Sequence, residues 1–325
     1  MRIPLAAAFL ALAGSAGAQA LARAAWPLKA PFTVMNTIAT LQYYGDQPGF
    51  HHGVDLRAAA GSKVYAPVSG AVGAGYYYPR HKIPYAFMVS IDADDGRRWE
   101  LHHVDPASLP QDILGLVARH GRVEAGTLLA EVYDTAKAPQ LNVPPHLHVD
   151  LMDSQGVRHD ALGLFPPLAD PRVPEIRGIY LVGPGDRAVA GAAGGVRRPT
   201  LPPGTYDLVV DALETVSAGT AGDAPYALEV LASGRAVGSL LFERLPDADY
   251  LKGVDAVYRL KPFAGLDGAP VENRIDTEAP RRFLFRFPFN TADFGARGDI
   301  PLEVRVRNRA GGESRAELRL SLASR

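Results

Sequence analysis

Hydrophobic and polar residues alternate with a period of two along many short segments of the chain, as in strands that bury one face. In the second half the alternation covers residues 206–213, 226–231, 283–287, 302–307 and 318–322. Six or seven such runs in about 150 residues favour a β-sandwich of immunoglobulin-like type. We therefore expect an all-β second half with no catalytic-looking polar cluster.

The first half also shows short strand-like segments separated by turn residues, without a sustained helical pattern. Residues 87–91 and 97–103 flank an Asp-Gly pair at Asp95 and Gly96, which is a hairpin signal. Further strands are predicted at 64–66, 70–72, 128–132 and 146–151. The sequence therefore predicts a mostly antiparallel sheet.

A proline-rich stretch separates the two halves. Residues 164–174 contain prolines at 166, 167, 171 and 174, and proline favours extended backbone in itself and in the residue before it. We place a domain boundary near residue 172, which gives domains at 21–172 and 173–325. The Gly-, Ala- and Pro-rich segment 183–204 is predicted to be a long mobile loop of the second domain.

The N-terminus has the features of a secretory signal. One positive residue, Arg2, precedes an apolar run from Ile3 to Ala13 and small residues that end in Ala18-Gln19-Ala20. A membrane anchor would need about 20 apolar residues, which are not present. We expect cleavage after Ala20, no transmembrane segment in the mature chain, and a soluble protein in the periplasm or outside the cell.

Composition narrows the possible chemistry. The 325 residues carry a formal net charge of -1, so no basic surface for nucleic acid or an anionic membrane is indicated. There is no cysteine, which excludes thiolate catalysis and cysteine-ligated zinc. Six of the nine histidines occur in three pairs, at 51/52, 102/103 and 146/148. Any metal must be held by histidine and carboxylate.

The pair at 146 and 148 lies in a predicted strand. Residues two apart on a strand point to the same face, so His146 and His148 would project together while Leu147 packs on the other side. Such a pair alone is more often a polar face than a metal site.

A second element joins His51 to Asp55, four residues later, with Gly53 between them. Glycine lets the backbone bend or approach closely. Zinc accepts imidazole nitrogen and carboxylate oxygen, and three protein ligands leave a fourth position open for water. Two histidines and one aspartate are thus a catalytic type of ligand set, although the spacing alone also arises by chance.

The third pair follows the predicted hairpin. In a regular strand Leu101 and His103 share one face, and Glu100 and His102 share the other. Only one of the two histidines is therefore expected to face a common site, and the periodicity does not decide which.

In this order the three elements resemble the lysostaphin and LytM type of zinc peptidases, which cut peptide crosslinks in bacterial cell walls. The HxGxD, YxHL and HxH markers of that family are matched by His51, Gly53 and Asp55, by Leu101, His103 and Val104, and by Pro145, His146 and His148. Segments 60–72 and 123–132 are also similar. The resemblance covers residues of about 36 to 165.

The resemblance implies one zinc ion held by His51, Asp55 and His148, with His103 and His146 as catalytic histidines. It favours His103 over His102 and makes His52 a variable surface position. The sequence departs from the family pattern in three places: Asp150 where Glu is usual, Leu101 in place of Tyr, and a longer loop at 75–85 that contains Tyr76, Tyr77, Tyr78 and His81.

The mechanism expected from this ligand set uses zinc to lower the pKa of water from about 15.7 towards about 7. We assign His146 as general base, and His103 as the residue that stabilises the oxyanion or protonates the leaving amine, although the two roles can be exchanged. The expected substrate is the peptide stem of peptidoglycan, with the specific crosslink and the oligomeric state left open.

Three alternatives remain. The first is a non-catalytic relative that activates a cell-wall amidase, and the second is a peptidase of secreted Gly-rich proteins. The third is an adhesive β-sandwich protein with incidental histidines.

Overall fold

The computed structural model describes residues 24–80, 82–168, 172–192, 200–216, 222–245, 249–275, 281–294 and 298–323. The predicted signal segment 1–20 and His81 lie outside these residues. Strands dominate both halves of the chain, which confirms the all-β expectation. None of the helices in the described ranges is long and apolar enough to cross a membrane.

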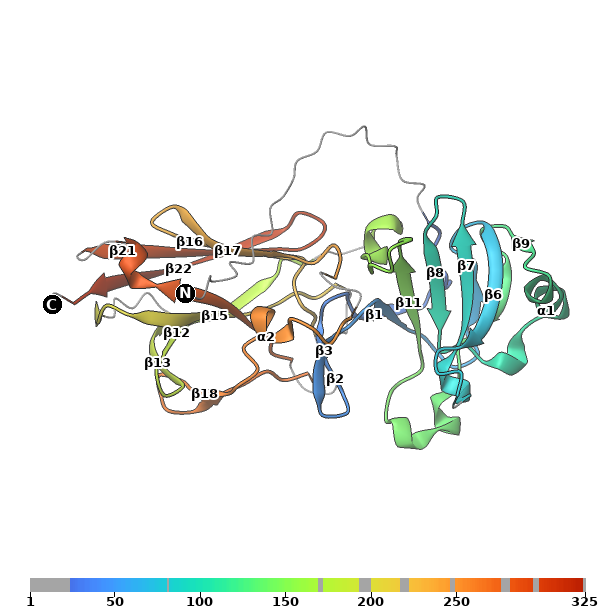
Figure 1. Cartoon of the computed structure of the whole chain (residues 1–325), viewed down its shortest axis with the longest axis horizontal. Helices are drawn as coiled ribbons and strands as arrows, with labels where there is room; N and C mark the ends of the chain where they lie inside the picture. The colour runs from blue at the N-terminus through green and yellow to red at the C-terminus, as the bar shows by residue number, and fades with distance from the viewer. Residues whose placement is uncertain are drawn as a thin grey trace, which may run out of the picture.

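The first half contains a seven-stranded antiparallel sheet in the order β1-β4-β11-β8-β7-β6-β9 (Figure 1). The strands are β1 Thr33–Asn36, β4 Val54–Arg57, β6 Gly70–Tyr76, β7 Phe87–Ala93, β8 Arg98–His102, β9 Arg122–Val123 and β11 His146–Met152. A two-stranded sheet pairs β5 Lys63–Tyr65 with β10 Leu128–Glu131. The hairpin predicted around Asp95 and Gly96 joins β7 to β8.

Alternation along β11 divides the sheet into an apolar and a polar face. Leu147, Val149 and Leu151 belong to the first hydrophobic core, where they pack with the fully buried Trp99. The residues between them are polar and point to the opposite face, as a period of two requires. That polar face carries the histidine and aspartate side chains of the candidate site.

The first half also contains an α-helix that the sequence analysis did not predict, α1 Gln111–Ala118. Pro110 precedes its first residue, a position that proline tolerates, and only Ile113 is fully buried. Eight residues with one buried side chain give a weak helical pattern. Short 3-10 turns occur at η1 Pro84–Ala86, η2 Pro106–Ser108, η3 Thr135–Lys137, η4 Pro139–Leu141 and η5 Ala161–Leu164.

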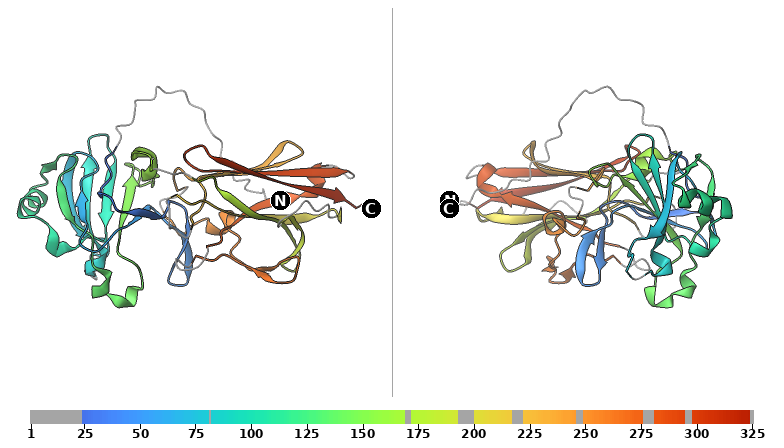
Figure 2. Two further views of the ribbon diagram at one scale, coloured as in Figure 1. Left: turned by 180° about the vertical axis from the view of Figure 1, so that it is seen from behind. Right: turned by 45° about the vertical axis from the view of Figure 1, so that its right-hand side comes forward.

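The second half consists of two layered sheets, visible in both views of Figure 2. The six-stranded sheet has the order β19-β18-β13-β12-β15-β20, and the five-stranded sheet the order β14-β22-β21-β16-β17. Most neighbours are antiparallel, but β13 with β18 and β14 with β22 are parallel. The remaining short elements are α2 Val254–Val257 and η6 Thr291–Phe294.

The five predicted segments at 206–213, 226–231, 283–287, 302–307 and 318–322 fall largely within five of these strands, and the other strands were not predicted. The strands of the two sheets are β12 Glu175–Gly183, β13 Arg187–Ala192, β14 Thr200–Leu201, β15 Thr205–Leu213, β16 Ala227–Ala232, β17 Arg235–Leu241, β18 Phe263–Ala264, β19 Pro270–Val271, β20 Leu284–Asn290, β21 Asp299–Arg307 and β22 Glu313–Leu322. Inward side chains of both sheets form the second hydrophobic core, including Val210, Phe285, Val304 and Leu318.

The predicted mobile loop at 183–204 is partly wrong. Residues Arg187–Ala192 form β13, which pairs with β12. Ala188 and Ala190 are buried, so small residues that looked like loop composition are packed inside a sheet. Residues 193–199 of this prediction lie outside the described part of the chain.

A hairpin of the first half is packed into the second core. It consists of β2 Leu41–Tyr44 and β3 Gln47–Phe50, and it lies beside α2 in Figure 1. Leu41 and Phe50 belong to the second core, together with Ile38. The hydroxyl of Tyr258 donates to the carbonyl of Ala39 at 2.8 Å. The segment that leads into His51 is therefore held by the second half of the chain.

Candidate metal centre

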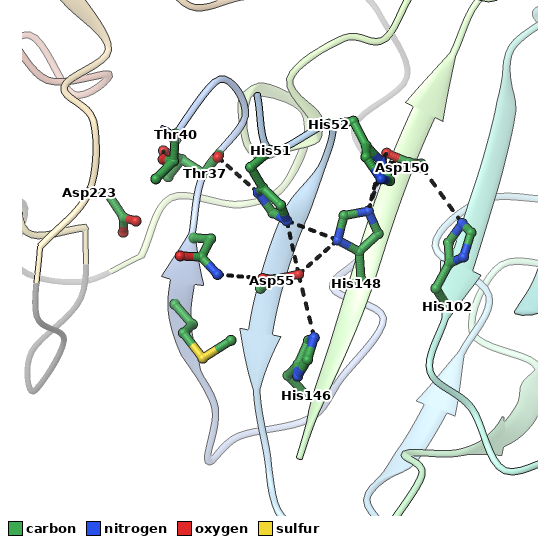
Figure 3. Close-up of polar contacts among 12 residues, drawn as sticks. Thr37, Thr40, His51, His52, Asp55, His102, His146, His148, Asp150 and Asp223 are labelled. Atoms are coloured by element: carbon green, nitrogen blue, oxygen red, sulfur yellow. Dashed lines mark hydrogen bonds and ion pairs between the residues drawn. The ribbon is translucent and has the colours of Figure 1, made fainter. Parts of the chain in front are cut away.

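The three predicted ligands converge on one point (Figure 3). Nε2 of His51 lies 3.0 Å from Nδ1 of His148 and 3.2 Å from Oδ1 of Asp55. Nδ1 of His148 lies 2.7 Å from the same carboxylate oxygen. All three side chains are buried.

Strand pairing explains this convergence. Asp55 on β4 and His148 on β11 are direct partners in an antiparallel pair, so their side chains project from the same face. His51 follows β3, and main-chain hydrogen bonds from Ala39 to His51 and from His51 to Thr40 fix its position. Its Nδ1 lies 3.0 Å from the carbonyl of Thr37 and must donate to it, which leaves Nε2 as the free lone pair that faces the centre.

The donor set fits a zinc ion. Bonds of about 2.0–2.1 Å in a tetrahedral site separate the ligand atoms by about 3.3 Å. The observed separations of 3.0, 3.2 and 2.7 Å are close to this value. Two imidazole nitrogens and one carboxylate oxygen leave a fourth position open, as in catalytic zinc sites.

The surroundings keep Asp55 charged. Burial alone would raise its pKa, but His51, His146 and His148 together hold that pKa well below the usual range. Its second oxygen, Oδ2, accepts a hydrogen bond from the side-chain amide of Asn36 at 2.5 Å. Asn36 lies in none of the recognised motifs and was therefore not predicted.

The two predicted catalytic histidines lie beside this ligand set. The ring centroids of His103 and His146 are 4.7 Å apart. Nδ1 of His103 donates to the carbonyl of Tyr85, and Nδ1 of His146 donates to the carbonyl of Pro144, each at 2.8 Å. Nε2 is therefore the unprotonated nitrogen of both rings, and that of His146 also lies 3.4 Å from the hydroxyl of Tyr85. Burial is the main cause that lowers both pKa values.

The expectation that only one of His102 and His103 faces the site is wrong. The ring centroid of His102 lies 5.4 Å from that of His148, and the centroid of His103 lies 6.0 Å from it. Strand β8 ends at His102, and His103 has a left-handed φ of 63°. This change of backbone breaks the alternation and brings the second imidazole to the same face.

Asp150 forms a second group of buried polar side chains behind His148. It is 0% exposed, and its Oδ1 lies 2.8 Å from Nδ1 of His52 and 3.4 Å from Nε2 of His148. Its Oδ2 lies 3.6 Å from Nε2 of His102, which also contacts Glu100 at 3.1 Å. The carboxylate that replaces the usual Glu therefore still contacts a predicted ligand.

The prediction that His52 is a surface residue is wrong. His52 is only 9% exposed, because it lies between Asp150 and the ring of Tyr250 from the second half, with the ring centroids of His52 and Tyr250 5.0 Å apart.

Two carboxylates raise the pKa of His148. Burial alone would lower this pKa, but Asp150 and Asp55 raise it to about 10. The same negative field favours a cation at this position.

A cleft of about 1010 Å³ surrounds the centre. Its lining includes the site histidines, Ile275 and Arg281 of the second half, and the five tyrosines Tyr43, Tyr44, Tyr77, Tyr78 and Tyr85. The ring of Tyr85 stacks on His103 with centroids 3.9 Å apart. The sequence analysis noted part of this aromatic group only as an unusual loop.

A segment in the first half of the chain is similar to a known protein family. Residues 49–160 match the profile of Peptidase family M23. This match confirms the resemblance to LytM-type zinc peptidases that the motifs predicted. The matched segment contains all five predicted site residues: His51, Asp55, His103, His146 and His148. No curated protein matches the chain.

Two solved structures show distant similarity. One is the SpoIIQ–SpoIIIAH pore forming complex, with 15% identity, a TM-score of 0.28, and coverage of 40% of this chain and 84% of that chain. The other is Csd3 of Helicobacter pylori, with 20% identity, a TM-score of 0.24, and coverage of 37% and 32%.

Proposed function

We propose that this chain is an exported zinc metalloendopeptidase that hydrolyses peptide bonds in peptidoglycan crosslinks. The observation that carries the proposal is the convergence of His51, Asp55 and His148 in a cleft that also contains His103 and His146. The match to Peptidase family M23 supports the peptidase class. The predicted signal at 1–20 supports export.

His51, Asp55 and His148 would hold the zinc ion through Nε2, Oδ1 and Nδ1. When bound, zinc supplies Lewis-acid polarisation of the scissile carbonyl and lowers the pKa of water towards about 7. The donor set favours this ion, because it combines two imidazoles with one charged carboxylate and contains no thiolate.

The unprotonated Nε2 atoms of His103 and His146 determine what these two residues contribute. Each Nδ1 is committed to a main-chain carbonyl, so each ring can accept one proton on Nε2 and then donate it. We assign His146 to take a proton from the attacking water, because its Nε2 lies 3.8 Å from Oδ1 of Asp55 and thus close to the candidate metal. His103 would then stabilise the oxyanion or protonate the leaving amine.

The cleft is consistent with an extended peptide substrate. Its volume of about 1010 Å³ lies at the upper end of the range for ligand pockets, and its walls carry tyrosine rings with few fixed charges. Exposed rings of Tyr43 and Tyr78 line the cleft and offer apolar contact area together with a hydroxyl group. These features would suit a mixed polar and apolar chain such as a peptide stem.

The test is hydrolysis of peptidoglycan by the purified protein, with and without a chelator, followed by mass spectrometry of the released peptides. We expect peptide release that stops with the chelator and returns when zinc is added back. Zinc content by elemental analysis separates an enzyme from a non-catalytic relative without metal. Bound zinc without peptide release would contradict the proposed substrate, and a protein without zinc affinity would contradict the metal centre.

A further inference from the structure

The two carboxylate oxygens of Asp55 have different partners. Oδ1 lies 3.2 Å from His51 and 2.7 Å from His148, whereas Oδ2 accepts the hydrogen bond from Asn36 at 2.5 Å. Asn36 therefore holds the carboxylate by the oxygen that does not face the other ligands. Such an outer hydrogen bond fixes the orientation of a metal ligand.

The orientation of the Asn36 amide is determined by its two neighbours. Nη1 of Arg281 donates to Oδ1 of Asn36 at 2.7 Å. A guanidinium group can only donate, and an ionised carboxylate can only accept, so the amide must direct its oxygen to Arg281 and its NH₂ group to Asp55. If the amide were rotated by half a turn, its NH₂ group would face the guanidinium of Arg281, and its oxygen would face the carboxylate of Asp55. Neither contact could then be a hydrogen bond.

A β-bulge places Asn36 between these neighbours. The register of β1 against β4 shifts between Val34 and Asn36, which leaves Met35 without a partner residue on β4. The carbonyl of Met35 then accepts from Nη1 of Arg281 at 3.2 Å. Asn36 is buried, so water does not compete strongly for its hydrogen bonds.

Arg281 belongs to the second half of the chain and directly precedes the segment that leads into β20. It is 3% exposed, and its Nη1 also lies 3.3 Å from Oδ1 of Asp223 and 3.2 Å from the carbonyl of Gly222. Figure 3 shows Asp223 near Thr37, which lies one residue after Asn36. Acceptors from both halves of the chain therefore surround Nη1 of Arg281 and fix its position.

We propose that Arg281 is a positioning residue of the metal centre, which orients Asn36 so that Asn36 presents Asp55 to the ion. The inference rests on the proposed function, because it takes His51, Asp55 and His148 as the zinc ligands. The second half of the chain would then help to orient a metal ligand of the first half. A peptidase domain that ended near residue 172 would lack this contact.

The experiment measures the zinc dissociation constant of the full chain by competition with a chromophoric chelator. Arg281→Met is compared with Arg282→Met, a matched control whose wild-type side chain pairs with Asp211 inside the second half. We expect Arg281→Met to weaken zinc binding by about 10-fold, the lower end of the effect of removing an outer partner of a metal ligand, because Arg281 contacts the ligand Asp55 only through Asn36. Arg282→Met is expected to stay within about twofold of the wild type.

A double-mutant cycle with Asn36→Ala distinguishes positioning from general loss of packing. If Arg281 acts through Asn36, the effect of Arg281→Met on zinc affinity should largely disappear in the Asn36→Ala background. Asn36→Ala leaves the pair of Arg281 and Asp223 in place, so it tests the inference even if Arg281→Met does not fold.

Two results would overturn the inference: wild-type zinc affinity in folded Arg281→Met or in Asn36→Ala, or fully additive losses in the double variant. Failure of the proposed function looks different. In that case the wild type either binds no zinc or binds zinc without cleaving peptidoglycan. Zinc binding without cleavage still permits the comparison of the variants.

Discussion

Asp55 and His148 are separated by 93 residues in sequence, yet Oδ1 of the first lies 2.7 Å from Nδ1 of the second. The two residues are partners across the antiparallel strands β4 and β11, so a single register sets both the distance and the common face. A shift of that register by one residue would turn His148 into the apolar core. The pairing of these two strands is therefore part of the candidate site.

Removal of a ligand should abolish metal binding. We expect His148→Ala to weaken zinc affinity by more than about 100-fold and to remove peptidase activity, because only His51 and Asp55 would remain. The measurement is zinc content after dialysis, together with peptide release. His159→Ala is the matched control, since His159 contacts Asp153 after the end of β11 and does not line the cleft, and it should retain both properties. Full zinc occupancy in His148→Ala would contradict the ligand assignment.

Replacement of a catalytic histidine should separate binding from catalysis. His103→Ala and His146→Ala should each lower kcat by about 10²- to 10⁴-fold while zinc stays bound, because neither ring is among the three proposed ligands. Peptide release and zinc content are measured on the same samples. His120→Ala, at an exposed histidine after α1, should behave as the wild type. Loss of zinc from either catalytic variant would instead make that histidine a ligand.

Gly53 should tolerate no side chain. A Cβ atom at this position would lie 2.9 Å from Nε2 of His148 and 2.7 Å from Oδ1 of Asp150, and it would also meet the carbonyl of Val149. We expect Gly53→Ala to destabilise the fold by about 1–3 kcal/mol and to weaken zinc binding.

Chemical denaturation and zinc titration measure the two effects of Gly53→Ala. Gly75→Ala is the control, because no atom lies within 4 Å of the Cβ that it would add. Equal stability of the two alanine variants would show that the backbone near Gly53 moves aside at little cost.

The second half should lose stability as pH rises. Burial raises the pKa of Glu214 to about 8 and that of Asp223 to about 7, so the folded state prefers both carboxyls protonated. The stabilisation is fully present below the ordinary carboxyl pKa values, and it is lost as pH rises through about 7 to 8.

The variant Glu214→Gln mimics the protonated form and should gain stability at pH 8.5 on the order of 5 kcal/mol, because the pKa of Glu214 is raised from 4.5 to about 8 and one pKa unit corresponds to about 1.4 kcal/mol. Urea unfolding at several pH values measures this gain. Glu317→Gln, at an exposed position, is the control. A wild-type curve without a decline between pH 5 and about 8.5 would show that the buried carboxyls do not titrate in this way.

The sequence was sufficient to predict strand β11, which carries His146 and His148, but it did not predict β4, which carries Asp55. The alternation of His146, Leu147 and His148 requires both imidazoles to share a face, and the structure has this arrangement on β11. The HxGxD motif brings His51 and Asp55 together within five residues. The catalytic and metal-binding roles of these residues stay predictions, as does the domain boundary near residue 172.

Residues joined only by tertiary packing could not be predicted. Asn36 and Arg281 lie 245 positions apart, and no periodic pattern connects them. The burial of His52 depends on Tyr250, which also comes from the other half. The position of His103 depends on a left-handed φ that non-glycine residues rarely adopt. The alternation of a regular strand therefore did not predict the direction of its side chain.

The hairpin β2–β3 has a consequence for how the chain can be divided. Leu41 and Phe50 are buried among side chains of the second half, although both precede the first proposed ligand in sequence. A gene fragment that ended at the proline-rich segment would expose these apolar side chains to water and would invite aggregation. Recombination at that segment would separate side chains that share one hydrophobic core, so we expect an exchange of either half alone to destabilise the fold.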